Sequence, residues 1–117
     1  MRILITGGSS GLGAEVLRSL LKDTDDEIWC TRHRQQIPVS DPRINTIELD
    51  LGSDFTQALA DLPFDLVIHF AAVTHASDEA EYWRVNAEGT ARLAQLTHKS
   101  GCRRFVCQPH LRSDFAG

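Results

Sequence analysis

Residues 3–13 read Ile3-Leu4-Ile5-Thr6-Gly7-Gly8-Ser9-Ser10-Gly11-Leu12-Gly13, a short apolar run followed by a glycine-rich turn and the start of a helical pattern. Glycines in such a turn allow a positive φ, a close approach of the backbone to a ligand, and close packing of helix on strand. The helix start adds free N–H groups and the positive end of a dipole, which together favour a diphosphate. We therefore predict a nucleotide-binding turn made of Thr6, Gly7, Gly8, Ser9, Ser10, Gly11, Leu12 and Gly13.

A glycine-rich sequence is also typical of two other kinds of turn. A purely structural strand-to-helix turn would need no ligand, but the strand before it and the amphipathic helix after it favour binding. The phosphate loop of the GxxxxGK[ST] type needs a lysine directly after its last glycine, and Ala14 follows Gly13 here. The sequence excludes this second type of loop.

Beyond the turn, the chain alternates short apolar runs with helical patterns. The predicted strands are residues 3–5, 27–31, 44–49, 65–72 and 104–107. The predicted helices are residues 12–22, 53–59 (capped by Ser53, with Asp54 at its positive end) and 78–99 (ended by Gly101). The order β-α-β-β-α-β-α-β predicts a doubly wound parallel α/β sheet of about five strands, covered by helices on both faces. We expect one face of the first helix to pack on the sheet through Leu12, Val16, Leu17, Leu20 and Leu21.

Composition restricts the class of protein. A chain of 117 residues with 42% hydrophobic positions forms one domain, which we place at residues 1–107, followed by a divergent tail at 108–117. Twelve basic against sixteen acidic residues give a net charge of −4, which argues against nucleic acid as a partner. No apolar run approaches the roughly 20 residues that would span a bilayer.

Cysteine and histidine spacing argues against metal and disulfide frameworks. The chain has an odd number of cysteines, Cys30, Cys102 and Cys107, and these lack a CxxC spacing. The five histidines show neither HxxxH nor HExxH, so we predict no metal site. We expect a cytoplasmic protein, with Cys30 and Cys107 buried in strands as small hydrophobes.

A series of motifs follows in order along the chain. They are Ile3-Leu4-Ile5-Thr6-Gly7-Gly8, Asp50-Leu51, His69-Phe70-Ala71-Ala72, Val85-Asn86-Ala87-Glu88-Gly89-Thr90 and Arg104-Phe105-Val106. In this order they resemble the N-terminal portion of an extended short-chain dehydrogenase/reductase, the NAD-dependent epimerase/dehydratase group. The glycine spacing itself, TGxxxGxG, is that of the single-domain branch, whereas extended members usually carry TGxxGxxG.

The resemblance implies a Rossmann fold that binds NAD(P) and that is truncated here before its sixth strand. It implies that Asp50 and Leu51 lie by the adenine ring, and that Phe70, Ala71 and Ala72 leave room for the cofactor beside His69. Asn86 is then expected to contact the cofactor or the backbone of the fourth strand. The family often forms homodimers through its helices, so a homodimer is a further expectation.

Residues at the end of the second strand indicate which dinucleotide is preferred. An acidic residue there would bind the ribose 2′-OH and repel a 2′-phosphate. This chain offers Thr31, Arg32, His33 and Arg34 instead. Guanidinium groups pair well with phosphate, so Arg32 and Arg34 predict NADP over NAD. The alternative is a solvated loop in which neither arginine faces the site.

The catalytic residues that the resemblance calls for are not in the chain. The family uses a Tyr-x-x-x-Lys pair, well after the fifth strand, but the only tyrosine here is Tyr82, with Asn86 four residues later. We predict no independent turnover and assign no catalytic residue. Two hypotheses follow: the NAD(P)-binding portion of an epimerase, dehydratase or reductase whose relatives often act on nucleotide sugars, or a non-catalytic module that senses NADP or docks a partner.

Overall fold

The computed structural model describes residues 1–7, 11–32, 37, 39–50, 54–59, 63–70 and 79–107, with backbone only at 11, 79, 81–83, 85 and 86. The predicted tail at 108–117 lies outside these residues. The described elements are β1 (Arg2–Thr6), α1 (Gly11–Asp23), β2 (Glu27–Arg32), β3 (Ile44–Glu48), α2 (Thr56–Leu59), β4 (Leu66–His69), α3 (Glu79–Lys99) and β5 (Arg104–Cys107). The predicted order of strands and helices is confirmed.

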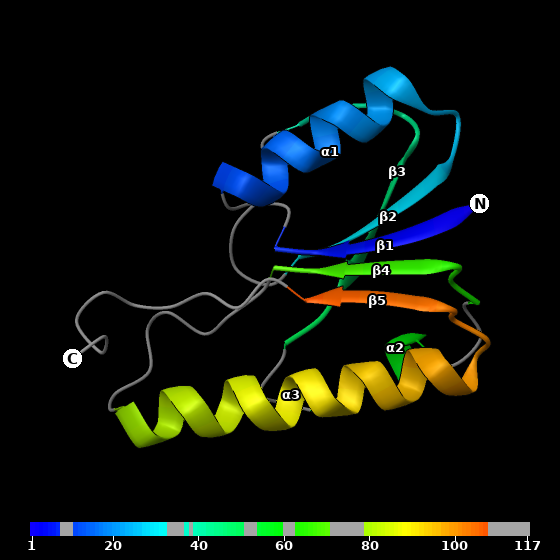
Figure 1. The fold of residues 1–117 in the computed structure, drawn as a ribbon. Coiled ribbons are helices and arrows are strands. Elements are labelled where there is room, and N and C mark those ends of the chain that lie inside the picture. Colours follow the sequence, from blue (N-terminus) through cyan, green and yellow to red (C-terminus); the bar gives the residue numbers. More distant parts are fainter. Residues whose placement is uncertain are drawn as a thin grey trace.

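The five strands form one parallel sheet in the order β3-β2-β1-β4-β5, with β1 at its centre. The chain runs outward from β1 to β3 on one side, then returns to β4 and continues to β5 on the other. This is the doubly wound arrangement, and it confirms the predicted fold class. All five strands end at the same edge of the sheet, so the segments that follow them lie together (Figure 1).

Helices cover both faces of the sheet, with α1 on one side and α2 and α3 on the other (Figure 1). Alternation along β1 divides the core, because successive side chains point to opposite faces. The cluster on the α1 face comprises Ile3, Ile5, Leu17, Ile28 and Cys30. The cluster on the α3 face comprises Leu4, Ile47, Leu49, Phe55, Leu59, Phe64, Val67 and Leu93.

Glycine and arginine fix the ends of the two long helices. Gly101 has φ +98°, and the amides of Gly101 and Cys102 donate to the carbonyl oxygens of His98 and Thr97 at 3.0 and 2.9 Å. This pair of bonds is a Schellman motif, which confirms the predicted end of α3. The end of α1 is held from outside by Arg43, whose guanidinium donates to three backbone carbonyls. Nothing in the described part of the chain is a helix long and apolar enough to cross a membrane.

Two expectations about burial and one about the start of a helix were wrong. Leu12 is 56% exposed, because the sheet-facing side of the first turn of α1 is occupied by the buried residues Gly13 and Ala14. Cys107 is exposed, because it ends a strand that, within the described sheet, pairs with β4 alone. Helix α2 begins only at Thr56, whose amide and hydroxyl both donate to Asp54.

Cys30 behaves as predicted. Its side chain is fully buried on the α1 face, and burial raises the pKa of its thiol to about 12. A thiol with so high a pKa is protonated at neutral pH and acts as a small apolar group.

Candidate functional site

The candidate site lies where the order of the strands reverses. The chain leaves β1 toward β2 and leaves β4 toward β5, so the two connections depart in opposite directions from neighbouring strands. In doubly wound sheets ligands bind in the crevice outside the carboxyl ends of such strands. Thr6 and His69 are the register partners that end β1 and β4.

The described part of the glycine-rich turn begins in a left-handed backbone conformation. Gly7 has φ +76°, a conformation that side chains with a Cβ rarely adopt. Gly13 and Ala14 are buried, so the first turn of α1 packs closely on the sheet. The first turn of α1 contains no acidic residue, so no carboxylate of that turn opposes an anion at the positive end of the helix.

Threonine and histidine side chains join the strand ends to α3. The Thr6 hydroxyl lies 2.6 Å from Nδ1 of His69, and Nε2 of the same ring lies 2.9 Å from the Thr90 hydroxyl. Thr6 and His69 are both buried. Burial lowers the pKa of His69 to about 4, so the imidazole is neutral at pH 7 and can donate from one nitrogen and accept at the other.

The backbone after β4 is tied to the same threonine. The Phe70 amide donates to both the hydroxyl and the carbonyl oxygen of Thr6, at 3.1 Å each. The Phe70 ring packs against the α1-face cluster. Phe70 therefore begins the segment after β4 directly beside the end of β1.

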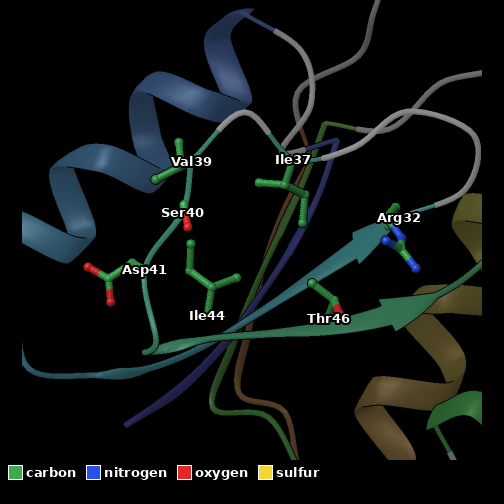
Figure 2. A pocket seen from close by; sticks show the side chains of 7 residues that line it. All are labelled: Arg32, Ile37, Val39, Ser40, Asp41, Ile44 and Thr46. Atoms are coloured by element: carbon green, nitrogen blue, oxygen red, sulfur yellow. The ribbon is translucent and has the colours of Figure 1, made fainter.

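Arg32 ends β2 level with Gly7, because Cys30 and Ile5 are register partners and both residues lie two positions further on. Its Nη2 lies 3.0 Å from Oε1 of Glu48, the residue that ends β3. A cavity of about 280 Å³ opens beside Arg32 and runs along β3 past Thr46 to Ile44 (Figure 2). No described residue of the glycine-rich turn lines this cavity.

Asp50 follows β3 at the same edge of the sheet. It is half-buried, and the amide of the preceding Leu49 donates to the carbonyl oxygen of Arg32 at 2.9 Å. The structure thus brings Thr6, Gly7, Arg32, Asp50 and Phe70 to one edge, with Leu12 and Gly13 in the adjoining helix start. The backbone of α3 includes Asn86, whose side chain lies outside the description. Also outside the described residues are Gly8, Ser9, Ser10, Arg34, Leu51, Ala71 and Ala72.

Two residues that contact this edge have no role predicted from the sequence. They are Thr90, which lies on α3 in the motif at residues 85–90, and Glu48, which ends β3. Glu48 could have been found, because it lies two residues before Asp50 at the end of a predicted parallel strand. No comparable signal in the sequence pairs Thr90 with His69.

Comparison with known proteins decides the family. Residues 3–108 match the family described as the NAD dependent epimerase/dehydratase family. The chain belongs to this family. Its parallel five-stranded fold is therefore that of an epimerase/dehydratase domain, which confirms the resemblance seen in the sequence.

Relatives within the epimerase/dehydratase family carry different activities. The chain is 29% identical to dTDP-D-glucose 4,6-dehydratase of Mus musculus, over 90% of the chain and 34% of that protein. It is 31% identical to 3-beta-hydroxysteroid dehydrogenase of Mycolicibacterium neoaurum, over 90% of the chain and 31% of that protein. The crystal structure of DesIV, a dTDP-glucose 4,6-dehydratase from Streptomyces venezuelae with NAD and TYD bound, superposes with a TM-score of 0.74. It is 27% identical over 90% of the chain and 38% of that structure. The chain thus spans about a third of the length of these relatives.

Proposed function

We propose that this chain is the NAD(P)-binding portion of an epimerase, dehydratase or reductase. The observation that carries the proposal is Gly7, which has φ +76° at the end of β1, where the order of strands in the sheet reverses. Main-chain amides of the turn and the first turn of α1 hold the pyrophosphate. A bound nicotinamide supplies hydride transfer, and the chain's own residues bind and orient it.

NADP is the preferred dinucleotide in this proposal. Support comes from Arg32, which ends β2 level with Gly7, where an acidic residue would select NAD. Arg34 is proposed as the second cation for the 2′-phosphate. Two guanidinium groups bind a phosphate better than the ribose hydroxyl that NAD presents there.

Turnover is proposed to need residues beyond these 117. The single tyrosine, Tyr82, has Asn86 rather than lysine four residues later, so no pair is present that would pass a proton to or from a substrate oxygen. The named relatives act on nucleotide sugars in some cases and on a steroid in another. We assign the choice of substrate to the full-length protein. The three free cysteines fit a reducing, cytoplasmic setting.

Calorimetric titration of the purified chain with NADP⁺ and NAD⁺ tests the proposal. We expect both to bind, NADP⁺ more tightly, and the double variant Arg32→Ala, Arg34→Ala to lose more affinity for NADP⁺ than for NAD⁺. An equal loss of affinity for NADP⁺ and NAD⁺ in the double variant would reject the proposed preference for NADP. A Gly11→Val variant that keeps full affinity would reject the turn as the phosphate site.

A non-catalytic binding module is the second candidate, favoured by the same lack of a Tyr-x-x-x-Lys pair. It predicts NADP binding by the native full-length protein with no reductase, dehydratase or epimerase activity. Turnover by the full-length protein would exclude it.

A further inference from the structure

Arg32 and Glu48 form a cross-strand ion pair at the edge where the dinucleotide is proposed to bind. The two residues are register partners at the ends of β2 and β3, and Nη2 lies 3.0 Å from Oε1. The pair is well exposed, with 38% of the Arg32 side chain and 73% of the Glu48 side chain accessible. A ligand can therefore reach the Arg32 guanidinium from solvent without any change in the fold.

A guanidinium has more than one hydrogen-bonding edge, but its single positive charge is already matched by the Glu48 carboxylate. A 2′-phosphate that approaches Arg32 must therefore displace the carboxylate or share the guanidinium with it. In both cases, the loss of the ion pair between Arg32 and Glu48 offsets part of the attraction between Arg32 and the phosphate. A ribose 2′-OH carries no charge and meets no such competition.

We propose that Glu48 is a specificity-determining residue, which limits the preference for NADP over NAD by holding the Arg32 guanidinium. The proposal rests on the proposed dinucleotide function. Glu48 acts through Arg32, so it is a positioning residue. The exposure of both partners makes the competition modest, since exposed ion pairs contribute little to stability.

The test measures the ratio of the dissociation constants for NAD⁺ and NADP⁺ by calorimetry at low salt. It compares this ratio in the native chain with the ratio in the Glu48→Gln variant. Removing the carboxylate frees Arg32, so we expect the ratio to shift by about two- to fivefold toward NADP⁺. Glu48→Asp, which keeps the charge, should retain most of the native ratio. A purely structural role for Glu48 would weaken both dinucleotides alike and leave the ratio unchanged.

Two controls distinguish an effect of Glu48 through Arg32 from direct repulsion of the phosphate and from the general loss of a surface ion pair. Glu15→Gln breaks another exposed ion pair of 3.0 Å, with Arg18 on α1, and should leave the ratio as it is. In an Arg32→Gln background, Glu48→Gln should change the ratio by less than about twofold. A full effect in that background means direct repulsion of the phosphate by Glu48 and overturns the proposed route through Arg32. An unchanged ratio in Glu48→Gln also overturns the inference, whereas a native chain that binds neither dinucleotide contradicts the proposed function itself.

Discussion

The side-chain oxygen of Thr6 lies 2.6 Å from Nδ1 of His69, and this contact joins the ends of the two strands between which the order of the sheet reverses. Thr90 holds the other ring nitrogen from α3, and Phe70 donates its amide to Thr6. The start of the glycine-rich turn is thus anchored from β1, β4 and α3 together. An anchor of this kind orders the end of β1, and residues that are already ordered lose less entropy when a ligand binds to them.

Stability should depend on pH through His69. Its folded pKa of about 4 lies below the ordinary 6.5, so the unfolded chain binds the proton more readily. The contribution is fully present above pH 6.5 and is lost as the pH falls toward 4. We expect the free energy of unfolding, measured by urea titration, to fall by on the order of 2 kcal/mol between pH 7 and pH 5.

Replacing His69 by Gln should remove most of this dependence between pH 7 and pH 5, at the cost of lower stability at pH 7. The matched control is His98→Gln, because His98 is exposed in the last turn of α3. This control should keep the native pH dependence. Identical pH profiles for the native chain and the His69 variant would refute the assignment.

Gly7→Ala should lower both stability and dinucleotide affinity, because an alanine at φ +76° is strained by about 1 kcal/mol or more. Affinity for both dinucleotides should fall by about tenfold, which corresponds to about 1.4 kcal/mol. Gly101→Ala is the control, since Gly101 has φ +98° and an added Cβ would meet nothing within 4 Å. It should lose a similar amount of stability and no affinity. Equal affinity losses in the two variants would show that strain alone, rather than the turn, governs binding.

Leu93→Ala should be strongly destabilising. Leu93 is fully buried in the α3-face cluster with Leu4 and Val67, so truncation leaves a cavity and costs about 2–5 kcal/mol. Leu12→Ala removes the same atoms from a side chain that is 56% exposed and should change stability by less than about 0.5 kcal/mol. Chemical denaturation of both variants at pH 7 makes the comparison. Similar losses would mean that Leu12 is packed in solution.

Arg43→Gln should destabilise the end of α1. The Arg43 guanidinium donates to the carbonyl oxygens of Leu21, Thr24 and Asp26 at 2.8, 2.7 and 3.0 Å, and glutamine cannot reach all three. We expect a loss of about 1–3 kcal/mol in the free energy of unfolding. The control Arg18→Gln removes an exposed pair with Glu15 and should cost less than about 0.5 kcal/mol. A loss for Arg43→Gln as small as that of the control would contradict the role assigned to it.

Periodicity predicted the elements because the pattern that defines each one is local. The apolar runs Ile3-Leu4-Ile5 and Leu66-Val67-Ile68 both lie in strands of the sheet, and Gly101 ends α3 as its position after a helical pattern indicates. Leu12 and Cys107 were misjudged because their burial depends on position in the finished fold. Leu12 lies at a helix start where smaller neighbours face the sheet, and Cys107 ends the last described strand.

The contacts of the site could be predicted less well than its location. Parallel strands ending at one edge place Thr6, Arg32 and His69 together, and this follows from the order of elements alone. The partners of Arg32 and Arg43 depend on register and side-chain reach across residues 16 to 22 positions apart in the sequence. No local pattern encodes such pairs, so the contact between Arg32 and Glu48 emerged only from the structure, although the place of Glu48 in a predicted strand indicates that it lies near this edge.

The chain should be marginally stable or self-associate through the outer edge of β5. In the described sheet β5 pairs only with β4, and Val106 is 46% exposed on it. An open edge of this kind presents backbone donors and acceptors to a second strand, and a lysine placed on it opposes pairing. We expect sedimentation of the native chain to show association that grows with concentration and that Val106→Lys suppresses. Thr46→Lys, on the opposite edge strand β3, should leave the association intact. A native chain that stays monomeric at all concentrations and melts in a sharp, reversible transition would rule out association at this edge.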